Sequence, residues 1–223
     1  MDLKLTGKTV LITGGSRGIG FACAMAFAAE GCAVHIASRS QESLEAARDK
    51  IRARHNVPVE IHAADFSKGD TVRAVVDAVG HADILVNNAG AIPRGDILTM
   101  TEEKWRESWE LKMFGYVNAT RAMLEKMYAR KKGAVVNIIR LAGESFNYDY
   151  VAGTTANAGL MAFTRAVGSR SVDHGAGEGH QPAGHAHRPH DDAATQPGRA
   201  EVGRSRALAR TDHPHAVWPS GRA

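Results

Sequence analysis

The chain has 223 residues, 43% of them hydrophobic and 23% charged, a composition typical of one soluble globular domain with a sizeable core. Its formal net charge of +4 is spread along the chain without a basic stripe interleaved with aromatic residues, which argues against a nucleic-acid partner. No apolar run is long enough to span a membrane and the first residues do not resemble a secretory signal, so we expect a cytoplasmic protein that does not bind membranes. In that compartment Cys23 and Cys32 stay reduced.

Apolar runs alternate with amphipathic stretches over most of the chain. The predicted strands span residues 8–13, 33–37, 59–63, 84–87 and 134–139. The predicted helices span residues 18–30, 41–55, 70–79, 102–131 and 155–167. The first strand, KTVLIT, is continuously apolar or β-branched, as in a parallel strand that is buried on both faces. The alternation predicts an α/β fold with a Rossmann-type, doubly wound parallel sheet.

The composition changes near His174. Residues 174–223 contain no Ile, Phe, Tyr, Met or Lys and a single leucine, and neither helical nor strand periodicity persists there. Such a segment buries too little apolar surface to offset its ordering entropy, so we expect a nucleotide-binding domain at 1–173 and an irregular or disordered tail. Three histidines in the tail raise the alternative of a metal site: His185, His187 and His190. Since no second shell supports them, we expect no metal.

A glycine-rich turn follows the first strand and opens the first helix. Glycine lets the backbone turn tightly and approach a pyrophosphate, and the helix start offers unpaired N–H groups to the phosphates. The order strand, turn, helix distinguishes such a cradle from an ordinary glycine-rich turn. We therefore expect these residues to bind a dinucleotide: Thr13, Gly14, Ser16, Arg17, Gly18, Ile19 and Gly20.

These residues carry a resemblance to a known family. Thr13 to Gly20 (TGGSRGIG) resembles the TGxxxGxG motif of the classical short-chain dehydrogenases/reductases, and residues 87–90 (NNAG) resemble a second motif of that family. The resemblance runs from Lys4 to about Asp173 and implies a nicotinamide cofactor and oxidoreductase chemistry on a small carbonyl or alcohol substrate. It adds to the expected cofactor contacts Asp65 (at the adenine), Phe66, Asn88, Ala89 and Gly90.

The residues after the second strand bear on cofactor choice. Sites that prefer NAD place an acidic side chain there to bind the ribose 2′-hydroxyl. This chain has Ser38 and Arg39 instead, and a guanidinium forms a charge-assisted fork with a 2′-phosphate. Arg17 offers a second cation. NADP(H) is therefore the preferred cofactor and NAD(H) the other possibility; the alternative is that both arginines are solvated surface charges.

The resemblance implies a Ser, a Tyr, a Lys and an Asn that act on the substrate carbonyl, and this chain departs from the pattern at all four. VNIIRLAG resembles the family's VNISSxAG and places Arg140 at the Ser. ANAGL resembles SKAGL and places Asn157 at the Lys and Gly153 at the Tyr. LKMFG resembles VNxxG and places Lys112 at the Asn. Gly153 has no side-chain proton, and Asn157 has no charge to lower the pKa of a phenol.

Three alternatives could replace the missing catalytic groups. Tyr150 or Tyr148 brings a phenol to the vacant Tyr site, Lys112 stabilises charge on the reacting carbonyl, or Arg140 pairs with an anionic group of the substrate. Each of these side chains is alternatively a phenol at the edge of the core or a cation with a buried stem. The candidate catalytic residues are Lys112, Arg140, Tyr150 and Asn157.

Two functions are therefore weighed. The first is an NAD(P)(H)-dependent oxidoreductase, and the second is a catalytically silent NADP(H)-binding module or subunit. The resemblance also implies a homodimer formed through the helices at 102–131 and 155–167.

We interpret residues 175–223 as the product of a shifted reading frame. Codon degeneracy allows residues 179–182 to encode GINP in a shifted frame, and the last residues to encode FGR, which resemble later family segments in the expected order. A frameshift near His174 would leave the C-terminal strands of the sheet missing and the sheet edge exposed.

Overall fold

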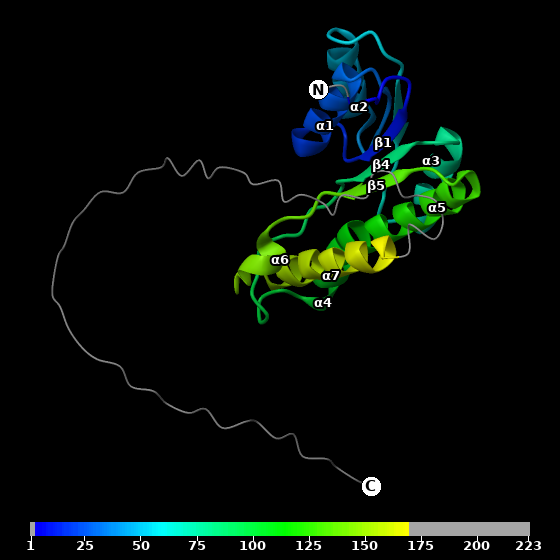
Figure 1. Ribbon diagram of the computed structural model, residues 1–223. Helices are drawn as coiled ribbons and strands as arrows, with labels where there is room; N and C mark the ends of the chain where they lie inside the picture. Colours follow the sequence, from blue (N-terminus) through cyan, green and yellow to red (C-terminus); the bar gives the residue numbers. More distant parts are fainter. Residues whose placement is uncertain (1–2, 170–223) are drawn as a thin grey trace, which may run out of the picture. The chain divides into compact units, whose positions relative to one another are not determined.

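A computed structural model of the chain describes residues 3–169. Within them, five strands form one parallel sheet in the order β3-β2-β1-β4-β5 (Figure 1). Their bounds are β1 (Thr9–Thr13), β2 (Ala33–Ser38), β3 (Val59–Ala63), β4 (Ile84–Asn87) and β5 (Ala134–Asn137). The order reverses between β1 and β4, which confirms the doubly wound sheet and sets the point where such sheets bind ligands.

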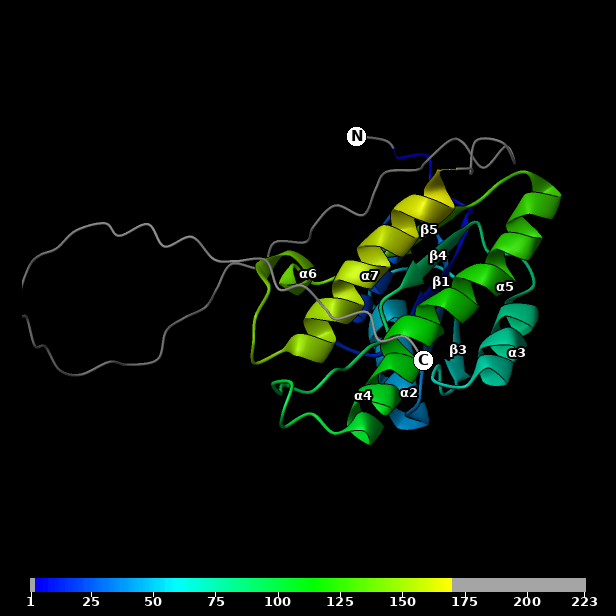
Figure 2. The ribbon, with the colours of Figure 1, turned by 90° about the horizontal axis from the view of Figure 1, so that it is seen from below.

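Helices cover both faces of this sheet, as Figures 1 and 2 show. Their bounds are α1 (Gly18–Ala29), α2 (Gln41–Arg52), α3 (Gly69–Val79), α4 (Glu102–Trp109), the π-helix η1 (Glu110–Phe114), α5 (Gly115–Arg130), α6 (Ala142–Ser145) and α7 (Val151–Gly168). α1 and α2 lie on one face, and α3 and α5 lie on the other. The Ser40 side chain caps α2 by accepting from the Ser43 N–H (3.2 Å).

β1 divides the core into two layers. Val10 and Ile12 pack with residues of α1 and α2, whereas Leu11 packs with residues of α3 and α5, and all three side chains are fully buried. This confirms the prediction of a strand buried on both faces, because alternate side chains of a strand point to opposite faces.

The structure differs from the sequence-based prediction at two helices. The helix predicted at 102–131 is interrupted by η1, whose wider turn coincides with an inward-pointing Lys112. η1 itself contains no Gly or Pro, and Gly115, which directly follows it, is the one residue here whose low helix propensity could have indicated the change. α7 begins at Val151, four residues before the predicted start, and the short helix α6 was not predicted.

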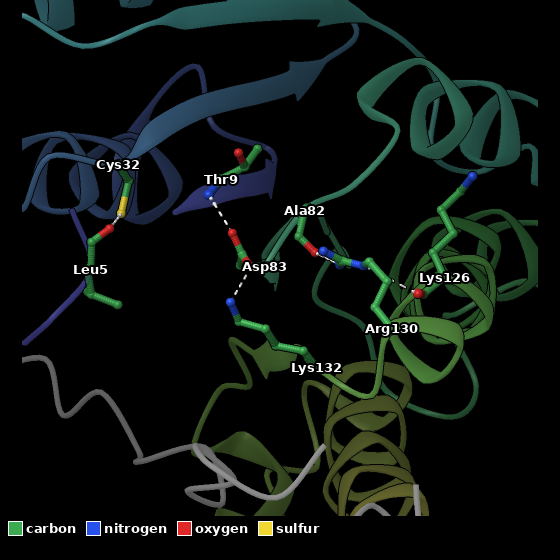
Figure 3. A network of polar contacts seen from close by, with 8 residues as sticks. All are labelled: Leu5, Thr9, Cys32, Ala82, Asp83, Lys126, Arg130 and Lys132. Carbon is green, nitrogen blue, oxygen red and sulfur yellow. Dashed lines mark hydrogen bonds and ion pairs between the residues drawn. The ribbon is translucent and has the colours of Figure 1, made fainter. Parts of the chain in front are cut away.

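A polar network joins the amino ends of β1, β4 and β5 (Figure 3). The Thr9 N–H donates to Asp83 Oδ2 (3.0 Å), and Lys132 Nζ lies 3.6 Å from Asp83 Oδ1. Arg130 donates to the Ala82 carbonyl oxygen (2.7 Å). The network therefore lies at the edge of the sheet opposite the carboxyl ends of the strands, where parallel sheets of this kind bind ligands.

β5 pairs with β4 alone among the described strands, and Val135 and Val136 are only half-buried. No helix of residues 3–169 is long and apolar enough to cross a membrane. The predictions for the tail, namely its irregular structure, its origin, its histidines and the domain boundary at 173/174, lie outside the described residues.

Candidate active site

The glycine-rich turn leaves the start of α1 open. α1 begins at Gly18, and its N-cap residue, Arg17, makes no side-chain capping bond. Gly18 has φ +57°, and a Cβ there would meet nothing within 4 Å. Arg17, Gly18 and Ile19 are exposed. The unpaired N–H groups and the positive end of the helix dipole are therefore available to phosphate oxygens.

The other glycines of the turn are required by close packing. Gly14 has φ +66°, and its Cβ would lie 2.8 Å from Asn88 Nδ2. A Cβ on Gly15 would lie 2.6 Å from the Ile36 side chain, and one on Gly20 would overlap the Gly14 carbonyl oxygen. Glycine is thus the one residue that lets this turn fit against β2 and β4.

Thr13 and Asn88 hold the turn in place. Thr13 Oγ1 accepts from the N–H groups of Asn88 (2.9 Å) and Ala89 (3.0 Å). Asn88 Nδ2 donates to the carbonyl oxygens of Thr13 and Gly14, each at 3.1 Å. Both residues were predicted to contact the cofactor, which stays a prediction; in the structure their side chains bond within the protein. They position the cradle across the point where the strand order reverses.

The carboxyl ends of β2 and β3 form the next part of the site. Ser38 Oγ is buried without a hydrogen-bond partner, and the neighbouring Arg39 is exposed and forms no ion pair within the described residues. Asp65 Oδ1 accepts from the Ser67 N–H (3.0 Å) and Oγ (2.8 Å). These bonds hold the pKa of Asp65 below its usual value, and the charge of Arg39 lowers it further.

Phe66, in contrast, is 3% exposed and packs in the core beside α3 and α5. The ring of Phe66 therefore belongs to the core, and the cofactor contact that the resemblance implies for this residue stays a prediction.

Lys112 is buried at the far end of the cradle. It is 6% exposed, and its stem lies so close to Gly90 that a Cβ on Gly90 would overlap it. Its Nζ donates to Tyr116 Oη (2.7 Å) and to the Ile138 carbonyl oxygen (3.1 Å). Burial, together with the charge of Arg140, lowers the pKa of Lys112 to about 7. Lys112 therefore exchanges a proton near neutral pH, as a general acid or base must.

Asn157 links the end of β5 to α7. It is fully buried; its Oδ1 accepts from the Arg140 N–H (3.1 Å), and its Nδ2 donates to the Gly153 carbonyl oxygen (2.7 Å). These two bonds bring three of the four altered family positions together. They also engage both polar atoms of Asn157, so this residue positions the site.

Tyr150 occupies the space of the missing tyrosine. A Cβ on Gly153 would overlap the Tyr150 ring at Cε1 and Cζ. Tyr150 is 9% exposed, whereas Tyr148 is 61% exposed, so Tyr150 is the phenol that the structure brings to the site. Its hydroxyl is one bond from Cζ and thus lies near the root of the side chain that a tyrosine at 153 would have. The Arg140 guanidinium carbon lies 5.9 Å from the centroid of the same ring.

The family follows from comparison with known proteins. Residues 8–175 match the model of the short chain dehydrogenase family. The chain belongs to this family. It is 38% identical over 146 residues to an uncharacterized oxidoreductase, YvrD, of Bacillus subtilis, which covers 64% of this chain and 55% of YvrD. It is 32% identical over 183 residues to the 3-oxoacyl-[acyl-carrier-protein] reductase FabG of Chlamydia muridarum, which covers 77% of this chain and 73% of that protein.

Solved structures of the short-chain dehydrogenases agree. The L-sorbose reductase of Gluconobacter frateurii, solved with NADPH and L-sorbose, superposes with a TM-score of 0.76 at 32% identity. The superposition covers 79% of this chain and 68% of the reductase. A putative betaketoacyl-ACP reductase superposes with a TM-score of 0.72 at 30% identity, covering 77% of this chain and 70% of that one.

Two features of this short-chain dehydrogenase were not predicted from the sequence. The first is Tyr116, which is 1% exposed and donates from Oη to the Ile138 carbonyl oxygen (2.9 Å). Its place one helical turn after Lys112 was the available signal. The second is a buried hydrogen bond between side-chain amides of β4 and β5, in which Asn87 Nδ2 donates to Asn137 Oδ1 (2.9 Å). Within residues 3–169, no group of three or more His, Cys, Asp or Glu side chains is placed to hold a metal.

Proposed function

We propose that this short-chain dehydrogenase catalyses NADP(H)-dependent interconversion of a small carbonyl compound and its alcohol. The observation that carries the proposal is the continuity of the site. At one end of the cradle lie the open start of α1 and Arg39, which follows β2. At the other end, Gly90 lies against the stem of the buried, titratable Lys112. That the L-sorbose reductase was solved with NADPH supports the choice of cofactor.

The residues present fit NADP(H). The N–H groups at the start of α1 would bind the pyrophosphate, and Asp65 would accept from the adenine. Arg39 and the unpartnered Ser38 hydroxyl would bind the 2′-phosphate, because a buried hydroxyl without a partner lacks a hydrogen bond that a ligand can supply. Arg17 adds a second positive charge at the phosphates. NAD(H), which lacks the 2′-phosphate, would leave Arg39 without this contact.

The reduced nicotinamide, when bound, supplies a hydride to the substrate carbonyl carbon. Lys112, as an ammonium, gives a proton to the carbonyl oxygen and is left as a neutral amine; in the reverse direction the amine accepts the alcohol proton. The Ile138 carbonyl oxygen and Tyr116 hold its Nζ in place. Burial raises the pKa of Tyr116, so that this phenol stays protonated and does not compete for the proton.

A second candidate function is a silent NADP(H)-binding module or subunit of a larger assembly. The observation that favours it is the state of the two central family positions. Gly153 carries no side chain, and both polar atoms of Asn157 already have a partner within the protein. Such a module would bind NADPH as tightly as an enzyme does but would transfer no hydride.

One experiment separates the two functions. NADPH absorbance is followed in the presence of a panel of small ketones, aldehydes and oxo acids, with the full chain and with Lys112→Met. Turnover that Lys112→Met abolishes, while NADPH still binds, supports the enzyme. Tight NADPH binding without turnover of any substrate supports the silent module, and absence of NADPH binding contradicts both.

A further inference from the structure

Two basic side chains, Lys112 and Arg140, lie together at the end of β5, and neither has a counter-ion among the described residues. Lys112 donates to the carbonyl oxygen of Ile138, and Arg140 follows two residues later. The positive charge of Arg140 acts on Lys112 directly, and no carboxylate is among the groups that perturb Lys112. The ion pairs of residues 3–169 include neither side chain.

The hydrogen bonds of Lys112 do not neutralise it. Its two acceptors, the Tyr116 hydroxyl and the Ile138 carbonyl oxygen, are both uncharged. A buried cation without an anion is costly, and a second cation beside it adds repulsion. A fold retains such an arrangement at a cost to stability, and an anionic ligand removes this cost when it binds.

The Arg140 side chain is free to provide such a contact. Its backbone N–H is fixed by Asn157, whereas its guanidinium is exposed, makes no side-chain hydrogen bond within residues 3–169 and lies over the Tyr150 ring. A guanidinium presents a planar fork of donors that matches the two oxygens of a carboxylate. The phosphates of the proposed cofactor would bind at the other end of the cradle, so they would not supply this anion.

We propose that Arg140, with Lys112 beside it, binds a carboxylate of the substrate, which makes the substrates of this protein short oxo acids and their hydroxy acids. This inference rests on the proposed function for the reaction itself. The carboxylate binds the Arg140 guanidinium, and the carbonyl of the same molecule lies toward Lys112. A neutral ketone or ester would leave the two cations unneutralised.

The test compares each acid with its methyl ester, because the ester removes the negative charge and adds only a methyl group. Pyruvate and acetoacetate, and their methyl esters, are each assayed by NADPH oxidation with the full chain. We expect KM for the acids to be lower than for the esters by about 10- to 150-fold, the range for one charge-assisted contact. Arg140→Gln should remove this difference by raising KM for the acids and leaving KM for the esters within about twofold.

Arg54→Gln is the matched control, since Arg54 is exposed in the segment after α2 and forms no ion pair with the described residues. It should leave KM for acids and esters unchanged. Arg140→Lys should restore part of the preference, because it keeps the charge and loses the fork. Equal KM values for an acid and its ester, or an acid preference that survives Arg140→Gln, would overturn the inference and leave the proposed function standing.

A binding measurement makes the inference independent of turnover. Oxamate, a carboxylate that cannot be reduced, is titrated by calorimetry into the full chain with and without NADP⁺. Oxamate binding that Arg140→Gln weakens by about 10-fold or more, without turnover of any substrate, supports the anion site while the proposed enzyme fails. No oxamate binding, or binding that is insensitive to Arg140→Gln, overturns the anion site.

Discussion

Lys112 brings an ionisable group into the buried interior of the fold. Its stem lies along Gly90 and its amine is satisfied by two neutral oxygens. Desolvation lowers its pKa from 10.5 to about 7, so near neutral pH the folded protein holds this residue partly as a free amine. The unfolded chain, in contrast, keeps it protonated up to about pH 10.

The effect of Lys112→Met on the free energy of unfolding should depend on pH, with a sign that follows from the lowered pKa of Lys112. Between about pH 7 and pH 10 the unfolded state binds one more proton at residue 112, so this residue makes the free energy of unfolding rise with pH, by up to about 1.4 kcal/mol per pH unit. Below pH 7 both states are protonated and the buried charge only destabilises. The Met variant should therefore be more stable than the parent at pH 6.5, and its advantage should shrink toward pH 9. Urea unfolding at a series of pH values measures this difference, and a pH-independent difference would refute the assignment.

Gly153 and Tyr150 should be coupled in stability. A Cβ at 153 overlaps the Tyr150 ring, so Gly153→Ala should destabilise the protein by about 1–3 kcal/mol. In a Tyr150→Ala background the space is vacant, and the same change should be neutral or stabilising, because Ala favours a helix over Gly by about 1 kcal/mol. A double-mutant cycle from urea unfolding gives the coupling energy. Additive effects of the two substitutions would show that Tyr150 does not fill the space at position 153.

At the scale of elements, the junction of β1, the glycine turn and α1 decides whether a cofactor binds. Gly20→Ala should lower the free energy of unfolding and weaken NADPH binding together, because the added Cβ overlaps the Gly14 carbonyl oxygen and pushes α1 away from the turn. Gly69→Ala, at the start of α3, is the control, since its Cβ would lie 3.3 Å from the flexible Asn118 side chain. Thermal unfolding and NADPH titration of both variants test this, and unchanged NADPH affinity in Gly20→Ala would contradict it.

The elements that the sequence predicted well are those with a strong local signal. The five strands and the glycine turn are read from continuous apolar runs and from glycines that the structure shows to be sterically required. The break at η1 carried a weaker signal, because its own residues are ordinary helix formers and only Gly115, directly after it, has a low helix propensity. Alignment with the family motifs placed Lys112, Arg140 and Asn157 at the site. The separate role of each residue depends on contacts between β5, α5 and α7. Sequence spacing does not encode those contacts. Phe66 matches a family position in the sequence, but in the structure its ring packs in the core.

At the scale of the whole molecule, we propose that the chain forms a homodimer through the region of α4, η1, α5 and α7. Several large apolar side chains of this region are exposed or only half-buried, and Trp105, Trp109 and Phe114 line one hollow with Ile97 and Met100. The same hollow is also lined by Glu102, Arg106 and Glu110, and apolar side chains rimmed by charged ones are typical of an interface. Phe114→Asp should shift the sedimentation profile from dimer toward monomer. A parent chain that sediments as a monomer would rule the dimer out.

We propose above all that the carboxyl edge of this sheet is a site for NADP(H). Calorimetric titration of the full chain with NADPH and with NADH, repeated on Arg39→Asp, tests it most directly. We expect NADPH to bind more tightly than NADH, and Arg39→Asp to weaken NADPH binding by about 10- to 150-fold, the value of one charge-assisted contact, and to reverse the preference. Equal affinity for the two nucleotides, or NADPH affinity that Arg39→Asp leaves unchanged, would contradict the claim.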